Sequence, residues 1–392
     1  MKMKINGREV EFTSGKTVLE VAKENGISIP HLCYLESAEE PYAGCRLCLV
    51  EVEGLDKPVT SCTLQAREGM SVKTHTGRIL RHRRNIMEML LANHPNDCLY
   101  CNKEGHCDLQ KIAGEVGLGE QRFYGEKRIQ PQDISSPAIT RDPNKCVLCG
   151  RCVTVCQSIQ EVGILEIVKR GFLSRVSPGF YEGLGVSPCI SCGQCVTVCP
   201  TGALSETSHV DDVIEALGNS NLKTVFQLAP SIPATLANEY GIKSVEEMLG
   251  KIAGALFELG AYAVFDTTFA ADLTVMEEST ELIKRIKEKT APLPMFTSCS
   301  PGWVRYMENN YPQLLPHLST CKSPQQMAAA VIKKIYAPGK GLRAEEIFSV
   351  SVMPCTAKKM EADEFGDVDA VLTTRELINL FKTMGIYLTN IK

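Results

Sequence analysis

Two segments decide the fold of the middle of the chain: DPNKCVLCGRCVTVCQ at residues 142–157 and SPCISCGQCVTVCPTGAL at residues 187–204. Each spaces its cysteines as Cys-x2-Cys-x2-Cys-x3-Cys, and both contain CVTVC. Thiolates at this spacing ligate 4Fe-4S clusters. One such run alone could form a zinc site, but two runs with a shared internal sequence argue against zinc. The repeat therefore predicts two cubic iron–sulfur clusters.

The spacing of the two runs is typical of bacterial two-cluster ferredoxins, in which the fourth cysteine of each run ligates the cluster of the other run. The first cube would then be bound by Cys146, Cys149, Cys152 and Cys199. The second cube would be bound by Cys189, Cys192, Cys195 and Cys156.

A third group of thiols precedes the repeat: Cys33, Cys45, Cys48 and Cys62. Such a set suits either a 2Fe-2S cluster or a zinc ion. The residues before it predict a hairpin over 1–12 that turns at Asn6-Gly7, then a short helix with a Thr17/Glu20 capping box that ends at Gly26. This order of hairpin, helix and ligand loop resembles a plant-type ferredoxin β-grasp, so we expect a 2Fe-2S cluster. The first gap, of eleven residues, resembles the variant in large respiratory and hydrogenase subunits.

The fourth group lies in ANHPNDCLYCNKEGHCDLQ, residues 92–110, and comprises His94, Cys98, Cys101 and Cys107. His106 is a rival ligand, but it is adjacent to Cys107, and two neighbouring side chains would not easily reach one iron. We expect a 4Fe-4S cluster bound by His94 and three cysteines, whose less negative charge raises its reduction potential. The four groups use 15 of the 18 cysteines and one histidine. They predict one 2Fe-2S and three 4Fe-4S clusters.

The overall composition excludes several classes of protein. With 42 Lys and Arg against 46 Asp and Glu in 392 residues, the chain offers no electrostatic case for binding nucleic acid or an anionic membrane. No run of 18 apolar residues predicts a membrane span, and the charged N-terminus lacks the apolar core of a secretory signal. Four low-potential clusters need a reducing compartment, so we expect a cytoplasmic protein of anaerobic metabolism.

After about Ser205 the chain becomes poor in cysteine, and its pattern changes. Short β-branched or aromatic runs at 225–228, 261–265 and 347–350 alternate with amphipathic segments such as VEEMLGKIAGALFELG and STELIKRIKEK. This alternation predicts an α/β domain with a parallel or mixed sheet. Neither a GxGxxG turn nor a P-loop occurs, so nothing in this half supports a nicotinamide or flavin site.

Two further peptides stand out: PMFTSCSPGWVRYMENNYP at 294–312 and SVMPCTAKKMEADE at 351–364. We expect each to follow a strand, where α/β folds place their chemistry. Together with the cluster motifs, they resemble the large subunit of iron-only (FeFe) hydrogenases over essentially the whole chain. The first 200 residues alone would also resemble complex I large subunits and some formate dehydrogenase subunits. TSC-x-PGW and MPCTAKK resemble two of the three loops that hold the family's H-cluster.

The resemblance departs from the family pattern at this H-cluster. The family's first loop is Thr-Ser-Cys-Cys-Pro; Cys299 matches its proton-relay cysteine, whereas Ser300 stands in place of the ligating one. Cys355 matches the ligand of the second loop, and Lys358 the lysine that hydrogen-bonds a cyanide of the diiron centre. The third loop, a Cys-x3-Cys in a glycine-rich stretch, does not occur before Lys392. Serine oxygen poorly replaces a soft thiolate, so we expect no H-cluster and no catalytic residue, with Cys299, Cys355 and Lys358 as vestiges.

The remaining candidates have simpler explanations. Cys321 is expected to be a buried or half-exposed thiol, and Trp303 a core residue. Cys299 and Cys355 are expected to be packing residues in a vacant pocket, with a shared metal as the alternative. The residues Glu278, Glu281 and Ser319 fall where the family has a proton path, although a solvated helix face also explains the two acids.

We therefore predict an α+β multidomain chain. Its parts are a β-grasp 2Fe-2S ferredoxin-like domain at 1–78, a His-ligated 4Fe-4S domain at 79–120, a two-cluster bacterial ferredoxin domain at 121–207, and a truncated α/β hydrogenase-like domain at 208–392.

The resemblance implies an iron–sulfur electron-transfer subunit of a multisubunit, NAD(P)H-linked and electron-bifurcating hydrogenase-type complex. The implied partners are a flavin- and NAD-binding subunit of the complex I type, a thioredoxin-like 2Fe-2S subunit, and a separate catalytic subunit, such as a nickel–iron hydrogenase, or a ferredoxin. The alternative is an active iron-only hydrogenase that is truncated or completed by another chain; truncation would explain the missing loop but not Ser300. A complex I-like or sensory iron–sulfur protein would share the first half only.

Overall fold

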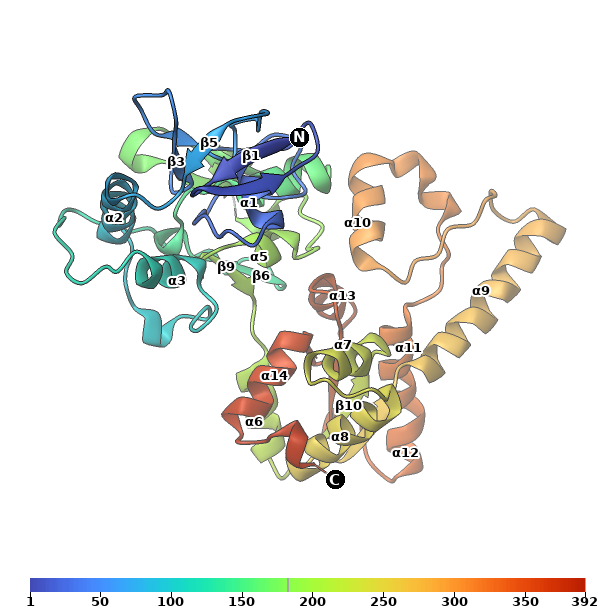
Figure 1. Cartoon of the computed structure of the whole chain (residues 1–392). Helices are drawn as coiled ribbons and strands as arrows, with labels where there is room; N and C mark the ends of the chain where they lie inside the picture. Colours follow the sequence, from blue (N-terminus) through green and yellow to red (C-terminus); the bar gives the residue numbers. More distant parts are fainter. Residues whose placement is uncertain (182, 392) are drawn as a thin grey trace. The chain divides into compact units, whose positions relative to one another are not determined.

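Residues 1–181 and 183–391 are described by a computed structural model, and they divide into two units (Figure 1). Unit 1 comprises residues 1–135, 140–187 and 194–205, and unit 2 comprises residues 136–139, 188–193 and 206–392. This division does not test the predicted domain boundaries at residues 78, 120 and 207.

Unit 1 begins with a mixed five-stranded sheet in the order β2-β1-β5-β3-β4. Its strands are β1 (Lys2–Ile5), β2 (Arg8–Glu11), β3 (Leu49–Val52), β4 (Val59–Thr60) and β5 (Ser71–Lys73). The predicted hairpin is confirmed: β1 and β2 are antiparallel, and the turn at Asn6-Gly7 has positive φ at both residues. β1 also pairs in parallel with β5, which returns from beyond the ligand loop.

The helix α1 (Val18–Glu24) packs its apolar face on this sheet, with Val18 and Val21 in the same buried cluster as Ile5. The predicted capping box is confirmed. The Thr17 hydroxyl accepts the Glu20 N–H at 3.3 Å, and the Glu20 carboxylate accepts the Thr17 N–H at 2.7 Å. Each arm of the box satisfies a backbone donor that a helix start leaves unpaired.

The rest of unit 1 is made of short elements joined by loops. Its helices are α2 (Gly77–Ala92), α3 (Asp108–Glu115), α4 (Arg151–Thr154) and α5 (Gln194–Val198). One small sheet pairs β7 (Leu165–Val168) with β8 (Arg175–Pro178). Another pairs β6 (Ile139–Arg141) with β9 (Leu204–Glu206), of which Ile139 and Glu206 belong to unit 2. α4 continues into a wider π-helical turn over Val155–Ile159, which carries Cys156.

Unit 2 is built on a four-stranded sheet in the order β11-β10-β12-β13, and every pair in it is parallel. Its strands are β10 (Lys223–Leu228), β11 (Ala263–Asp266), β12 (Ile347–Val352) and β13 (Ala370–Leu372). Its helices are α6 (Val210–Gly218), α7 (Ser231–Glu239), α8 (Val245–Glu258), α9 (Thr268–Glu288), α10 (Pro301–Asn310), α11 (Pro324–Val331), α12 (Ala337–Gly339), α13 (Ala357–Phe365) and α14 (Thr374–Thr383). The predicted α/β pattern with a parallel sheet is therefore confirmed.

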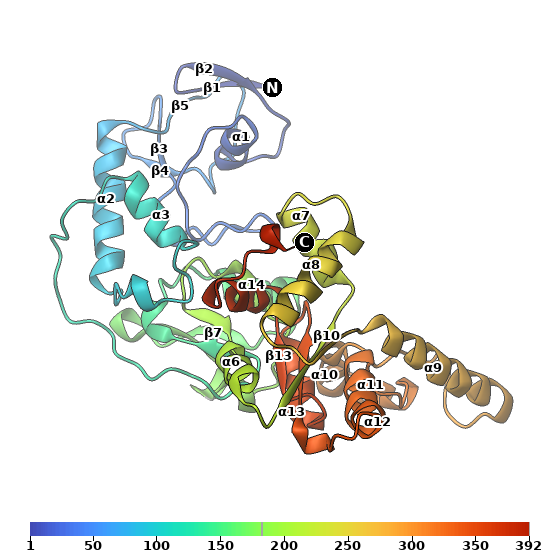
Figure 2. The ribbon, with the colours of Figure 1, turned by 90° about the horizontal axis from the view of Figure 1, so that it is seen from below.

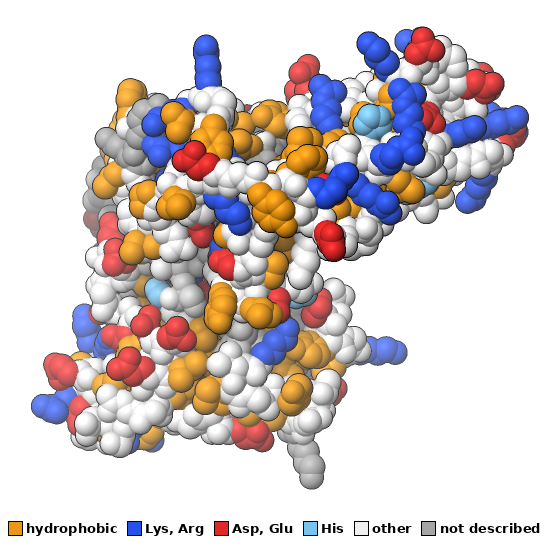
Figure 3. Space-filling view, turned by 90° about the vertical axis from the view of Figure 1, so that its left-hand side faces the viewer, with side chains coloured by type: hydrophobic (Ala, Val, Ile, Leu, Met, Phe, Trp, Pro, Cys, Tyr) orange, Lys and Arg blue, Asp and Glu red, His pale blue; other side chains and the backbone are white. Residues whose placement is uncertain are grey.

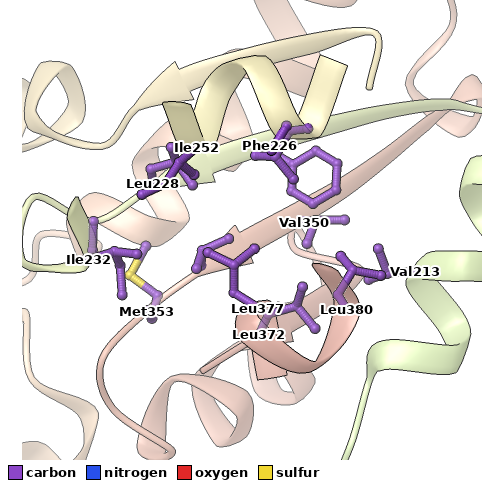
Figure 4. Packing of buried hydrophobic residues seen from close by; sticks show 14 of the residues in the cluster. Val213, Phe226, Leu228, Ile232, Ile252, Val350, Met353, Leu372, Leu377 and Leu380 are labelled. Atoms are coloured by element: carbon purple, nitrogen blue, oxygen red, sulfur yellow. The ribbon is translucent and has the colours of Figure 1, made fainter. Parts of the chain in front are cut away.

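Helices cover both faces of this sheet, and this explains why nearly all residues of its central strands β10 and β12 are buried. Figure 4 shows Phe226 and Leu228 of β10 and Val350 of β12 against Leu377 and Leu380 of α14. All five side chains are at most 1% exposed. α9 extends away from the sheet in Figures 1 and 2, and it packs on α11. The core thus fixes the carboxyl ends of β10 and β12, the second of which leads into the peptide with Cys355.

Basic and acidic side chains are interspersed with apolar ones on the face in Figure 3. Within the described residues, no helix combines the length and the apolar character that crossing a membrane requires.

Candidate metal centres

Four of the predicted thiols line one cavity within unit 1. Cys146, Cys149, Cys152 and Cys199 border it together with apolar side chains such as Val147, Val176 and Leu204. Burial raises the pKa of Cys149 to about 12 and that of Cys152 well above its usual range, because a thiolate is poorly solvated there. Such thiols favour the thiolate form when iron supplies the compensating positive charge. This arrangement fits the first predicted cube, whose four ligands come from both runs.

The two runs of the repeat have the same loop conformation. The Leu148 N–H donates to the Cys146 sulfur at 3.4 Å, and the Ser191 N–H donates to the Cys189 sulfur at 3.4 Å. Leu148 and Ser191 have φ values of 53° and 54°, and Gly150 and Gly193 follow with 76° and 72°. Backbone N–H groups turned toward sulfur stabilise its negative charge, which is a known means of tuning iron–sulfur clusters.

The loop with Cys189 and Cys192 is fastened to other elements of unit 2. The Thr356 hydroxyl donates to the Ser191 carbonyl at 2.7 Å, and the Asn309 amide donates to the Pro188 carbonyl at 2.8 Å. Cys156 and Cys195 are counted in unit 1. The second predicted cube, which needs all four cysteines, therefore stays a prediction from the sequence.

The thiols of the predicted 2Fe-2S group, Cys33, Cys45, Cys48 and Cys62, form two close pairs in unit 1. The sulfurs of Cys48 and Cys62 are 3.4 Å apart, and the Cys45 N–H is 3.5 Å from the Cys33 sulfur. A hydrogen bond from the Cys33 thiol, opposed by burial and helped by the Leu32 N–H, lowers the pKa of Cys45 to about 5. The loop is thus prepared to present a thiolate, which is the form that binds iron.

A buried arginine that sequence reasoning did not single out supports this loop. The Arg83 side chain of α2 is buried, and its Nε and Nη2 donate to the carbonyls of Leu47 and Leu49 at 2.9 and 3.0 Å. Burial lowers its pKa to about 10. In the sequence Arg83 stands within the basic run RHRR, which is more typical of a solvated helix face.

His94 follows the last turn of α2 and is buried. Its Nδ1 accepts the Asn96 N–H at 3.3 Å, whereas its Nε2 is buried without a hydrogen-bond partner among the described residues. Burial lowers its pKa and so favours the neutral imidazole, the form that ligates metals. The rival His106 is exposed. An orphaned, buried ring nitrogen is the property expected of a ligand, and it favours His94.

The three cysteines of this group, Cys98, Cys101 and Cys107, are half-buried. Burial raises the pKa of Cys107, and the nearby Cys101 and Cys98 raise it further. Among the described residues, no three His, Cys, Asp or Glu side chains converge as ligands of a single metal ion do. The ligands of a cluster bind different iron atoms and do not need to converge in this way.

Lys145 is a second buried cation that sequence reasoning missed. It is 7% exposed, and its Nζ lies 3.7 Å from carboxylate oxygens of both Asp97 and Asp142. Asp97 precedes Cys98, and Lys145 precedes Cys146. A buried charge needs partners of opposite sign, and this one connects the loop of the His94 group to the loop of the first cube.

The hydrogenase-like peptides meet through Lys358. Its Nζ donates to the Cys299 carbonyl at 2.8 Å and to the Glu361 carboxylate at 2.9 Å. Cys299 is exposed and Cys355 is half-buried after the end of β12. Ser300 is the residue before α10, and its side chain makes no capping hydrogen bond.

Two expectations about the first peptide are wrong. No strand directly precedes Cys299 in the described chain; Phe296 makes only an isolated parallel bridge with Leu318, because Pro292 and Pro294 interrupt the segment. Trp303 is not a core residue, since it is 40% exposed with its ring edge-on to Phe296. Cys321 is half-buried, as expected.

A buried polar network beneath the second peptide was missed. The Gln325 amide nitrogen donates to the Lys358 carbonyl and to the Glu361 carboxylate, at 3.1 and 3.0 Å, and its carbonyl accepts the Ser351 hydroxyl at 2.9 Å. Gln227, inside the apolar strand β10, donates to the backbone carbonyl of Gln325 at 3.0 Å. A glutamine within an otherwise apolar strand was the signal that could have revealed it.

The acids of the family's proton path fall on α9. Glu281 accepts the Ser319 hydroxyl at 2.9 Å and pairs with Arg285. One carboxylate oxygen of Glu278 is buried without a partner among the described residues. Glu281 and Ser319 are therefore joined, and the solvated-face explanation does not account for Glu281.

The fold and the ligand groups define a multidomain α+β iron–sulfur protein with a hydrogenase-like α/β domain. The family model of the iron only hydrogenase large subunit, C-terminal domain, matches residues 222–392. Models of a 2Fe-2S iron–sulfur cluster binding domain, the NADH-ubiquinone oxidoreductase-G iron–sulfur binding region and a 4Fe-4S dicluster domain match residues 1–77, 83–122 and 145–203.

Curated relatives extend this similarity over the whole chain. The NADP-reducing hydrogenase subunit HndD of Solidesulfovibrio fructosivorans is 43% identical over 398 residues, with 97% of this chain and 68% of the relative covered. Iron hydrogenase 1 of Clostridium pasteurianum is 38% identical over 390 residues, with the same coverage of 97% and 68%. The alpha subunit of the NADPH-Fe(3+) oxidoreductase of Geobacter sulfurreducens is 36% identical over 171 residues, 44% of this chain and 20% of the relative. The chain belongs to the iron-only hydrogenase large-subunit family.

Proposed function

We propose that this chain is the iron–sulfur electron-transfer subunit of a multisubunit NAD(P)H-linked, hydrogenase-type complex. The observation that carries the proposal is the cavity of unit 1 in which Cys146, Cys149, Cys152 and Cys199 meet, because these ligands come from both runs as electron-transfer ferredoxins require. One 2Fe-2S and three 4Fe-4S clusters would move single electrons without binding a substrate.

The proposed role of the hydrogenase-like domain, residues 208–392, is structural. Ser300 occupies the position of a family ligand, and a serine oxygen is a poor ligand for a soft iron–sulfur site. Cys299, Cys355 and Lys358 would then be vestiges of an H-cluster site that this chain does not use. The buried network of Gln227, Gln325 and Glu361 would keep these peptides folded without metal.

Four clusters without substrate chemistry need a donor and an acceptor. The proposed donor is a flavin- and NAD-binding subunit of the complex I type, with a thioredoxin-like 2Fe-2S subunit beside it. The proposed acceptor is a separate catalytic subunit, such as a nickel–iron hydrogenase, or a ferredoxin. HndD is, by its name, a subunit of an NADP-reducing hydrogenase, which supports this arrangement. Electron bifurcation, a reducing cytoplasmic location and the β-grasp class of the first domain belong to the same proposal.

The test is to reconstitute the purified chain anaerobically, count its iron and record its infrared spectrum. We expect about fourteen irons per chain from one 2Fe-2S and three 4Fe-4S clusters, and no carbonyl or cyanide bands. Infrared bands of a diiron centre, or hydrogen evolution by the isolated chain, would contradict the proposal.

A second candidate function is hydrogen activation by this chain, completed by another polypeptide or by further sequence. The contact between Lys358 and the Cys299 carbonyl favours it, because it holds together two of the peptides that the family uses. The same infrared measurement decides between the two functions, provided that it is repeated on the assembled complex.

A further inference from the structure

Tyr42 lies between two ligand loops of unit 1. It precedes Cys45 in the loop of the predicted 2Fe-2S group, and its ring packs against Gly150 in the loop of the first cube. A Cβ added at Gly150 would lie 3.1 Å from Cγ and Cδ1 and 3.2 Å from Cδ2 of this ring. The ring therefore covers the backbone of the facing loop at van der Waals contact.

A second glycine leaves room for the same ring. A Cβ added at Gly44 would lie 2.4 Å from Cε1 of Tyr42, closer than real carbon atoms approach. Gly44 has no positive φ, so its own conformation does not demand glycine. The space it leaves is occupied by Tyr42, whose hydroxyl makes no hydrogen bond that the described residues show.

The surroundings of Tyr42 include thiols of two different ligand groups. Its pKa is raised first by burial and then by the charges of Cys33, Cys149 and Cys146. Cys33 belongs to the predicted 2Fe-2S site, and Cys146 and Cys149 belong to the first predicted cube. The geometry agrees, because Tyr42 stands three residues before Cys45 and its ring contacts Gly150, the residue after Cys149.

We propose that the Tyr42 ring is the packing bridge for electron transfer between the 2Fe-2S cluster and the first cube. The proposal rests on the proposed function, since it needs both clusters. One electron leaves one cluster and enters the other, the ring is neither oxidised nor reduced, and no proton moves. Tyr42 is a positioning residue: it keeps the two loops in contact and excludes water from between them.

This assignment explains why an aromatic ring stands in an irregular loop. The ring is 47% exposed, so its burial alone contributes little to stability. A filled contact fixes the separation of the two loops, whereas a gap would admit water and let each loop move. The ring and not the hydroxyl is required, so phenylalanine should serve equally well.

The experiment compares Tyr42→Phe and Tyr42→Ala in the full reconstituted chain, with Tyr124→Ala as the control, since Tyr124 is 82% exposed in unit 1. Iron content and electron paramagnetic resonance first establish that both clusters are present. The readouts are the spin–spin broadening between the two clusters and the fast phase of their electron exchange after flash reduction. We expect Tyr42→Ala to lose both with its iron unchanged, and Tyr42→Phe and Tyr124→Ala to keep both.

A second variant covers the case in which Tyr42→Ala fails to assemble its clusters. Gly44→Ala retains the tyrosine but forces its ring away from Gly150, so it should lose the fast phase. In the Tyr42→Ala background it should cause no further change, because the ring it displaces is gone. A fast phase that survives in Gly44→Ala, or in a fully loaded Tyr42→Ala, overturns the bridge. Absence of the two clusters from the unaltered chain would instead overturn the proposed function.

Discussion

Unit 1 places its ligands on irregular loops, whereas unit 2 first builds a parallel sheet and then places its peptides beside it. Of the ten non-glycine residues with positive φ in the described chain, eight lie in unit 1. Each such residue costs about 1–2 kcal/mol. The buried apolar cluster of unit 2, around β10 and β12, is larger than the one beneath α1 in unit 1. We infer that unit 1 depends on its metal for its conformation, while unit 2 depends on its core.

The largest expected effect distinguishes Cys152, a predicted cluster ligand of unit 1, from Cys355, a thiol of unit 2. Cys152→Ala should remove the first cube, lower the iron content by about four atoms per chain and abolish electron flow through the chain. Cys355→Ala should leave both unchanged, because Cys355 binds no metal in the proposed function. Iron analysis measures the iron content, and reduction of an artificial acceptor measures the electron flow. Loss of activity in a well-folded Cys355→Ala would refute the proposed role of unit 2.

The second contrast concerns the core of unit 2. Phe226 is 0% exposed, so Phe226→Ala should destabilise unit 2 by about 3–5 kcal/mol. Thermal unfolding followed by circular dichroism should show a lowered transition, while the visible absorbance of the clusters in unit 1 persists to its original temperature. Phe257→Ala, at a 53% exposed site on α8, is the matched control. Simultaneous loss of the absorbance would show that the units do not unfold separately.

The third prediction is a pH dependence of unit 2. Nδ1 of His209 accepts the Val371 N–H at 3.1 Å, so the folded unit needs a neutral ring. Burial and the nearby Lys359 lower the pKa of His209, and this outweighs three neighbouring acids that raise it: Glu376, Asp212 and Asp363.

The unfolded chain therefore binds the proton more readily, and stability falls as the pH drops below about 6.5, by at most about 1.4 kcal/mol per pH unit. Denaturant titrations of unit 2 between pH 5 and 8 measure this slope. His209→Gln should flatten it, and His82→Gln, on the exposed side of α2, should not. An unchanged slope in His209→Gln would assign the effect to another group.

The smallest contrast compares two capping boxes. Thr17→Ala in unit 1 and Thr373→Ala in unit 2 should each cost about 1 kcal/mol. The loss in unit 2 should be the larger one, because Glu376 of its box also binds the buried Lys359 at 3.0 Å and the His209 N–H at 3.0 Å. The denaturant concentrations at the unfolding midpoints of the two units show which variant loses more stability. Serine at either position retains the cap and serves as the control.

Sequence reasoning succeeded where the signal is local. Cysteine spacing predicted the four thiols that line the cavity of unit 1, and the turn at Asn6-Gly7 and the Thr17/Glu20 box were found because each depends on a few adjacent residues. Alternating apolar runs predicted the parallel strands of unit 2 for the same reason. The assignment of ligands to particular clusters stays a prediction.

The residues that were missed are determined by partners far away in the sequence. Arg83 and Lys145 are charged, and only their distant carbonyl and carboxylate partners make their burial tolerable. In the sequence Tyr42 is only an aromatic residue in a loop. Its contact with Gly150, which is far away in the sequence, is seen only in the structure. Trp303 was expected in the core, but it stays 40% exposed beside Phe296.

The twin loops of the repeat imply a particular sensitivity to oxygen. Leu148 and Ser191 hold left-handed conformations while their N–H groups donate to the sulfurs of Cys146 and Cys189. Oxidation to sulfinic or sulfonic acid changes the size and charge of these sulfurs irreversibly. The two residues would then relax toward ordinary backbone conformations, and the loops would become substrates for proteases. We therefore expect oxidised protein to be cleaved within residues 146–150 and 189–193. Limited proteolysis can detect this cleavage without any measurement of electron transfer.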